Sequence, residues 1–220
     1  MDSFLVPVVA AASAPTLALA VGGPILVAMA WAIVRMGRAS VWTSMALCLG
    51  ALGILSLLTG EVRAGTRPSL PALVVLGIGA GVALYLATAV FLSLVRRWTT
   101  LTRHATALYG RGEGLPVVTV VILAAGITAG GEELLWRGVV QTVAAGTVGS
   151  LAGALLAWGM YVATNAFSGS LPIILGALVG GAVWTALALW TGGVAASLAC
   201  HAAWTTLMVT LPPLPTEDRA

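Results

Sequence analysis

The chain has 220 residues, of which 60% are hydrophobic and only 8% are charged, and its formal net charge is +3. A soluble domain carries about a quarter charged residues, so this composition excludes both a soluble enzyme and a disordered chain. Apolar stretches of about 20 residues recur along the sequence, which indicates a polytopic membrane protein.

Seven hydrophobic segments follow one another along the chain. They lie near residues 12–34, 41–59, 70–95, 116–145, 151–168, 171–190 and 193–211. Backbone polar groups inside a bilayer must be satisfied within their own segment, and no alternating β-barrel pattern is present. We therefore predict an all-α, polytopic membrane bundle of about seven transmembrane helices. The predicted parts are N-terminal transmembrane helices and a basic loop (1–115), a helical core (116–211) and a disordered tail (212–220).

The longest connection between the hydrophobic segments runs from Arg96 to Leu115 and holds four arginines. Its basic residues alternate with Trp98, Leu101 and Leu108, a pattern that suits an amphipathic helix lying in the membrane interface. A solvated basic loop is the alternative. Neither provides room for a soluble domain.

The ten basic residues are all arginines; eight of them lie between the apolar segments and one, Arg219, follows the last segment. That position favours a role in membrane orientation over nucleic-acid binding, with the lipid bilayer as the expected partner. Arg63 and Arg67 fall on one side of the predicted bundle. Seven fall on the other: Arg35, Arg38, Arg96, Arg97, Arg103, Arg111 and Arg219. The positive-inside rule then predicts an outer N-terminus and a cytoplasmic C-terminus.

Small residues gather on two of the apolar segments. Gly77 to Gly81 and Gly176 to Gly180 carry glycines at helical spacing, which predicts close packing between membrane helices. Cys48 and Cys200 each lie alone in an apolar run. We interpret both cysteines as small core residues.

The fourth hydrophobic segment holds the only acidic residues within the predicted spans, Glu132 and Glu133, together with Arg137. Each ionisable residue costs about 3 kcal/mol at the centre of a membrane span, so its presence is a functional hypothesis. Glu133 and Arg137 are four residues apart and can pair on one helix face, whereas Glu132 lies about 140° away from Arg137 around the helix. We assign Glu133 and Arg137 to structure. Glu132, without a local countercharge, holds a proton more readily and is the candidate general base.

Two further polar pairs occupy later segments at a spacing of four residues: Tyr161 with Asn165, and His201 with Thr205. Each pair lies on one face of its helix. Taken singly, such residues more often form hydrogen bonds between membrane helices. Together with Glu132 they predict a polar pocket that holds water between helices.

These residues resemble the motifs of the CPBP family of intramembrane proteases, the Rce1-like CAAX prenyl endopeptidases and bacterial Abi proteins. The run from Glu132 through Trp136 to Gly138 resembles the first motif, Glu-Glu-x-x-x-Arg. Tyr161 to Asn165 stands where the family has an aromatic-x-x-x-His motif, and His201 to Thr205 where it has His-x-x-x-Asn. The resemblance covers the predicted core, residues 116–211, and implies a bacterial cytoplasmic membrane as the location.

The resemblance also implies roles for individual residues. Glu132 would activate a water for attack on a peptide bond of a membrane-associated substrate, and His201 would stabilise the oxyanion or position the water. Asn165 replaces the family's second-motif histidine and can bind a water but cannot take its proton. Thr205 replaces the final asparagine and offers a hydroxyl. Glu133, Arg137 and Tyr161 would support the site.

The same residues leave three function classes open. The leading hypothesis is an intramembrane endopeptidase of this type. The second is a catalytically degenerate protein on the same fold that acts as a binding, immunity or scaffold subunit with a membrane-protein partner, as Asn165 suggests. The third is a small transporter or channel, although no inverted repeat is visible. Bacterial members of the family are often labelled metalloproteases, but a catalytic zinc needs about three protein ligands. Only Glu132 and His201 qualify, so we expect no metal and no other cofactor.

Overall fold

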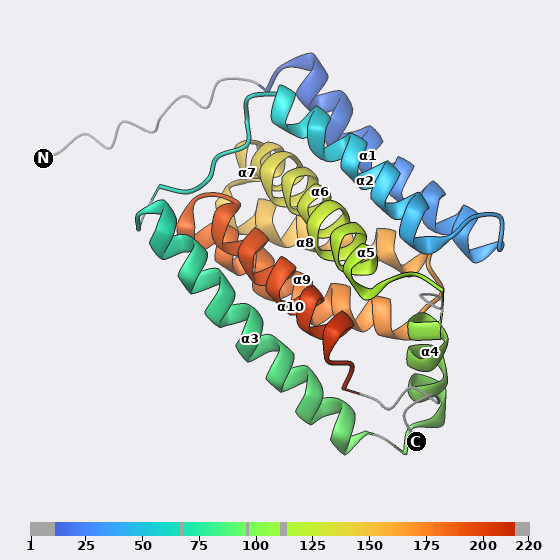
Figure 1. The fold of residues 1–220 in the computed structure, drawn as a ribbon. Coiled ribbons are helices and arrows are strands. Elements are labelled where there is room, and N and C mark those ends of the chain that lie inside the picture. Colours follow the sequence, from blue (N-terminus) through green and yellow to red (C-terminus); the bar gives the residue numbers. More distant parts are fainter. Residues whose placement is uncertain (1–11, 67, 96, 111–113, 214–220) are drawn as a thin grey trace, which may run out of the picture.

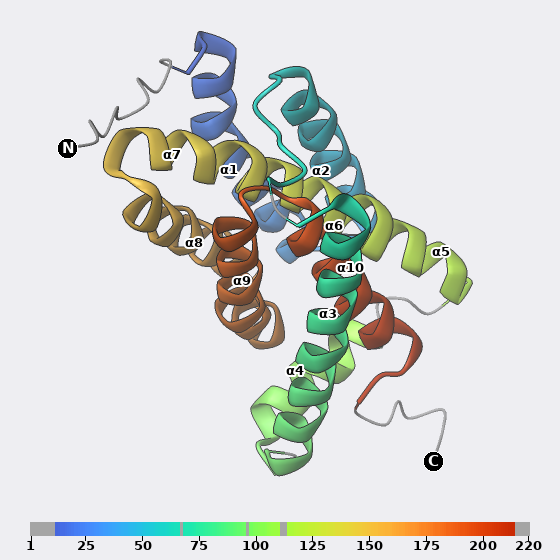
Figure 2. The same ribbon diagram turned by 90° about the vertical axis from the view of Figure 1, so that its left-hand side faces the viewer.

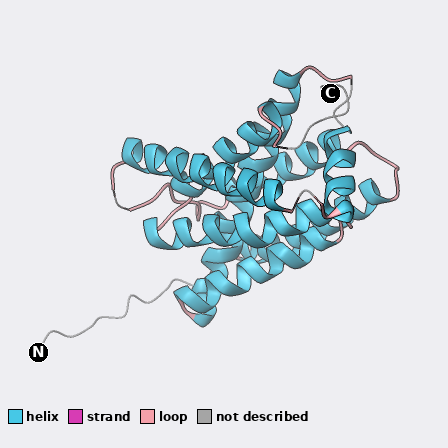
Figure 3. Cartoon of the chain, turned by 90° about the horizontal axis from the view of Figure 1, so that it is seen from below, coloured by secondary structure: helices cyan, strands magenta, loops and turns pink. Residues whose placement is uncertain are grey.

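The computed structural model describes residues 12–66, 68–95, 97–110 and 114–213 (Figure 1). Every regular element in these ranges is a helix (Figure 3), which confirms the predicted all-α class. The helices are α1 (Ala14–Arg35), α2 (Val41–Leu58), α3 (Leu70–Leu94), α4 (Thr99–Gly110), α5 (Val117–Val121), the π-helix η1 (Ile122–Thr128), α6 (Ala129–Glu133), the π-helix η2 (Leu134–Val140), α7 (Gln141–Val148), α8 (Ser150–Ala166), α9 (Leu171–Thr191) and α10 (Ala195–Thr210). Residues 214–220 of the predicted tail lie outside the described residues.

Short polar, proline and glycine signals set the ends of these helices. Ser13 precedes α1, and its hydroxyl accepts a hydrogen bond from the Thr16 backbone N–H at 3.4 Å. Pro71 and Pro172 stand in the first turns of α3 and α9. Proline lacks a backbone N–H, and in the first turn of a helix this group would have no helical acceptor. Gly192 ends α9 with a φ of +70°, a left-handed conformation that favours glycine.

Five helical segments are long and apolar enough to cross a membrane: α1, α2, α3, the continuous stretch Val117–Val148, and α9. The predicted count of seven is not confirmed, because α8 has 17 residues and α10 has 16. A 16-residue helix rises only about 24 Å, less than the roughly 30 Å of a bilayer core. Apolar side chains cover the outside of the bundle, and Leu47, Leu58 and Leu94 each expose at least 75% of their surface. The protein is therefore an integral membrane protein.

The stretch Val117–Val148 forms the middle of the bundle. The α1–α2 pair packs on one side of it and α10 on the other, while α3 runs along the outer side of α10 (Figures 1 and 2). Gly77 and Gly81 make the α3–α10 contact possible, because a Cβ on Gly77 would meet the Ala196 carbonyl oxygen and one on Gly81 would meet that of Cys200. The predicted packing role of these glycines is thus confirmed.

The basic connection after α3 contains a regular helix, α4, in place of an irregular loop. Leu101 and Ala105 are buried on its inner face and pack against Leu92 of α3. His104 accepts a hydrogen bond at Nδ1 from the Leu171 backbone N–H at 3.3 Å, which ties α4 to the start of α9. Arg96 and the side chain of Leu108 lie outside the described residues.

Candidate active site

The two glutamates lie on α6, a short α-helical piece between two π-helical turns of the central helix. Such wide turns are rare and occur frequently at functional sites. Gly131, next to Glu132, lies so close to α2 that a Cβ there would meet the Leu49 carbonyl oxygen. This close packing holds both carboxyl groups inside the bundle, where Glu132 is 5% exposed and Glu133 fully buried.

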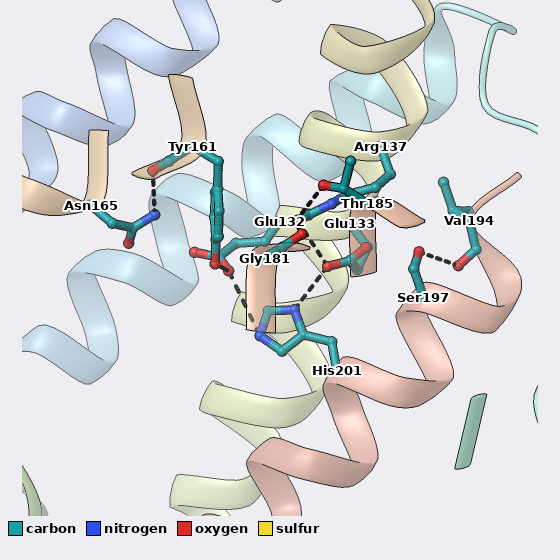
Figure 4. Close-up of polar contacts among 10 residues, drawn as sticks. All are labelled: Glu132, Glu133, Arg137, Tyr161, Asn165, Gly181, Thr185, Val194, Ser197 and His201. Carbon is teal, nitrogen blue, oxygen red and sulfur yellow. Dashed lines mark hydrogen bonds and ion pairs between the residues drawn. The ribbon is translucent and has the colours of Figure 1, made fainter. Parts of the chain in front are cut away.

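Glu133 and Arg137 form the ion pair that their spacing predicted, with 3.1 Å between Oε1 and Nη1 (Figure 4). Arg137 also donates from Nη2 to the Gly181 carbonyl oxygen at 3.0 Å and to the Thr185 hydroxyl at 3.3 Å. The pair therefore joins the central helix to α9. Glu133 has a second partner that the sequence did not predict, because its Oε1 lies 2.9 Å from Nδ1 of His201.

Glu132 lies apart from this ion pair and faces α8 and α10. Its Oε2 accepts a hydrogen bond from the Tyr161 hydroxyl at 2.8 Å and lies 3.8 Å from Nε2 of His201 (Figure 4). Tyr161 is thus the hydrogen-bond donor to Glu132, and its supporting role stays a prediction. The acid is neither turned to lipid nor paired with Arg137, and it shares His201 with Glu133.

His201 is held between the two carboxylates by an aromatic ring. The Trp184 ring stacks on its imidazole with centroids 3.5 Å apart and planes 13° from parallel. Gly180 leaves room for that tryptophan, because a Cβ there would lie 2.8 Å from the Trp184 ring. Sequence reasoning missed Trp184, since a tryptophan in an apolar helix carries no motif that distinguishes it from a lipid-facing one.

Asn165 does not hydrogen-bond to either glutamate or to His201 among the described residues. Its amide donates to the Tyr161 carbonyl oxygen at 2.9 Å and accepts from the Trp31 indole N–H at 3.1 Å. Trp31 on α1 was also missed, because nothing in the sequence links it to α8. Thr205 lies one turn after His201 and is partly buried.

These residues meet at a cavity of about 730 Å³ inside the bundle. Glu132, Tyr161, Asn165, His201 and Thr205 all line it, and much of the remaining wall comes from apolar side chains of α2, α3, α4, α9 and α10. A cavity of this size lies within the usual range of sites that bind a small ligand. The chemical groups of the site are thus in contact with a mostly apolar binding space.

The donor set does not fit a catalytic zinc. Such a site needs three protein ligands. Only two ligand atoms, Glu132 Oε2 and His201 Nε2, face the same point. Glu133 contacts the opposite edge of the imidazole, at Nδ1, and is already paired with Arg137. The described residues hold no group of three His, Cys, Asp or Glu side chains placed to bind a metal ion. The expectation of a cofactor-free site stays a prediction.

Comparisons with known proteins agree with the motifs. Residues 114–207 match the family model described as type II CAAX prenyl endopeptidase Rce1-like. No curated protein matches the chain, and no solved structure matches it either. The matched stretch begins just before α5 and ends within α10, so it contains both glutamates, Arg137 and His201. The resemblance to the CPBP family is therefore confirmed, and residues 114–207 are similar to the Rce1-like, CAAX-protease type.

Proposed function

We propose that this protein is an intramembrane endopeptidase that hydrolyses a peptide bond of a membrane-associated substrate. The observation that carries the proposal is the meeting of Glu132 and His201, 3.8 Å apart, on the wall of a 730 Å³ cavity within the bundle. A carboxylate and an imidazole at this distance, in contact with a binding space, can hold and activate one water.

The geometry suits a nucleophilic water. A single water oxygen can lie about 2.8 Å from both Glu132 Oε2 and His201 Nε2, which is an ordinary hydrogen-bond length. The water would attack the carbonyl carbon while Glu132 takes one of its protons, and that proton would pass to the leaving amine as the C–N bond breaks. Tyr161 fixes the Glu132 carboxylate by its hydrogen bond. Thr205, on the same cavity wall, offers a hydroxyl to the developing oxyanion.

The places of the arginines in the fold support one orientation in the membrane. Figure 1 shows the connection between α1 and α2 at the same end of the bundle as α4, and the connection between α2 and α3 at the other end. Arg35, Arg38 and Arg103 belong to the first end, and Arg63 to the second. We propose that the first end faces the cytoplasm of a bacterium and that the N-terminus lies outside.

Cleavage by the purified chain tests the proposal. The protein in detergent is incubated with a library of membrane-tethered peptides in ¹⁸O-labelled water, and the products are identified by mass spectrometry. We expect new C-termini that carry one ¹⁸O atom, because the attacking oxygen comes from water. Absence of cleavage across pH values, detergents and reconstituted bilayers would contradict the enzyme proposal.

The second candidate is a non-catalytic protein that binds a membrane partner on the same fold. The bonding of Asn165 favours it, because its amide is engaged by Trp31 and by the Tyr161 carbonyl group instead of facing Glu132. In this case the position of the family's histidine would have become a purely structural link between α1 and α8.

The variant Asn165→His separates the two candidates. An imidazole differs in shape from the amide, so at most one of the two Asn165 hydrogen bonds is expected to survive. If the chain is an enzyme, we expect the variant to cleave more slowly than the wild type in the same library assay. Cleavage that appears only in the variant would instead identify a degenerate site whose missing base has been restored.

A further inference from the structure

The contacts of Glu133 differ from those of a simple structural ion pair. One oxygen, Oε1, contacts both Arg137 Nη1 and His201 Nδ1, while Oε2 has no hydrogen-bond partner among the described residues. Arginine–carboxylate pairs frequently use both oxygens in a bidentate arrangement. Here the shared oxygen contacts both the guanidinium and the imidazole. The ion pair therefore contacts His201 on α10 as well as the Gly181 carbonyl group on α9.

This contact fixes where His201 carries its hydrogen. A buried guanidinium stays charged and requires an anionic partner, so Glu133 is an ionised carboxylate that can only accept hydrogen bonds. The imidazole nitrogen that faces it, Nδ1, must therefore carry the hydrogen. In a neutral imidazole the other nitrogen is then an acceptor. Nε2 faces Glu132 at 3.8 Å and would carry the lone pair of a neutral imidazole. The stacked Trp184 ring opposes rotation of the imidazole.

We propose that Glu133 is a positioning residue that holds His201 in the Nδ1–H tautomer, so that His201 Nε2 and Glu132 act as two proton acceptors for the same water. The inference rests on the proposed function for the presence of that water. It replaces the expectation that His201 is an oxyanion donor, because a lone pair cannot donate to an oxyanion. In this arrangement His201 is the imidazole that accepts from the water, a role that the Asn165 amide cannot fill.

The reaction then balances in protons. The water donates one hydrogen bond to Glu132 and one to Nε2, which directs its oxygen lone pair towards the substrate carbonyl carbon. As the C–O bond forms, one proton moves to Glu132, while Nε2 keeps the hydrogen bond from the second hydrogen of the water. When the C–N bond breaks, Glu132 gives its proton to the leaving amine. The second hydrogen stays on the new carboxyl group or passes to Nε2.

The tautomer can be measured without any substrate. In protein labelled with ¹⁵N-histidine and held in detergent micelles, the two ring nitrogens of each imidazole are distinguished by their long-range couplings to the ring protons. The chain has two histidines, and His104→Gln assigns the signals of His201. We expect the Nδ1–H form for His201 in the wild type. The Nε2–H form would overturn the inference.

A matched pair of double variants isolates the role of Glu133. Glu133→Leu with Arg137→Met removes the acceptor and both charges together, so that neither charge is left unpaired. Glu133→Gln with Arg137→Met also removes the charges but keeps a carbonyl oxygen beside Nδ1. We expect the first variant to adopt the Nε2–H form, because Glu132 is then the only carboxylate near the ring, and the second to keep the Nδ1–H form. An Nδ1–H form in both variants would overturn the proposal.

Activity gives the second readout. In the cleavage assay, kcat of the Leu/Met variant should fall about 10²-fold below that of the Gln/Met variant, with KM unchanged. Equal kcat values in the two variants, despite different tautomers, would overturn the catalytic part of the inference. An absence of cleavage by the wild type would instead overturn the proposed function, while the tautomer of the wild type still tests what Glu133 does.

Discussion

Glu132→Gln is expected to lower kcat for peptide cleavage by about 10²–10⁴-fold, the range that a positioned general base contributes. The amide has nearly the shape of the carboxylate, and its oxygen can still accept the hydrogen bond from the Tyr161 hydroxyl, which lies 2.8 Å from Oε2 in the wild type. The cavity and its apolar wall stay the same. We therefore expect KM and thermal unfolding to stay close to the wild-type values.

The matched control is Glu61→Gln, which removes a carboxylate of the same kind from the connection after α2. Glu61 does not line the cavity, so kcat of this variant should equal that of the wild type. Initial cleavage rates measured over a range of substrate concentrations separate kcat from KM for both variants. Equal activity of Glu132→Gln and the wild type would show that the observed cleavage does not depend on Glu132.

The sequence predicted the parts of the site that depend on one helix. The Glu133–Arg137 pair follows from a spacing of four residues, and the separation of Glu132 from Arg137 follows from the helical repeat. The hydrophobic segments likewise predicted the positions of the long helices, since a bilayer leaves helices as the available form for such runs. The two short helices, α8 and α10, are shorter than their predicted segments. Hydropathy alone does not fix the residue at which a helix ends.

The contacts between helices could not be predicted in the same way. The Glu133–His201 contact joins residues 68 positions apart, and the Trp31–Asn165 contact joins residues 134 positions apart. Both depend on the rotation of each helix about its own axis, which close packing at positions such as Gly81 and Gly131 determines. The resemblance to a family gave His201 a role, but only the geometry indicates which of its nitrogens faces which carboxylate.

Glu133→Leu alone is expected to lower the free energy of unfolding by about 3–5 kcal/mol, because it leaves a buried guanidinium without a countercharge. Arg137 keeps the Gly181 carbonyl oxygen and the Thr185 hydroxyl, and its guanidinium carbon lies 4.7 Å from the Tyr161 ring centroid, but none of these groups carries a charge. Arg137→Met alone should cost less, since Glu133 keeps its hydrogen bond with His201, whose Nδ1 lies 2.9 Å from Oε1.

The double variant Glu133→Leu with Arg137→Met should regain most of the lost stability, because replacing a whole buried pair with apolar groups is often neutral. Unfolding by sodium dodecyl sulfate in mixed micelles gives the four free energies of the double-mutant cycle, from which the coupling energy between the two side chains follows. A coupling energy near zero would mean that Arg137 is stabilised by Gly181, Thr185 and Tyr161 alone. Glu133 would then lack the ionised state that fixes the hydrogen of His201 on Nδ1, so the cycle tests the electrostatic premise of the proposed water site independently of any substrate.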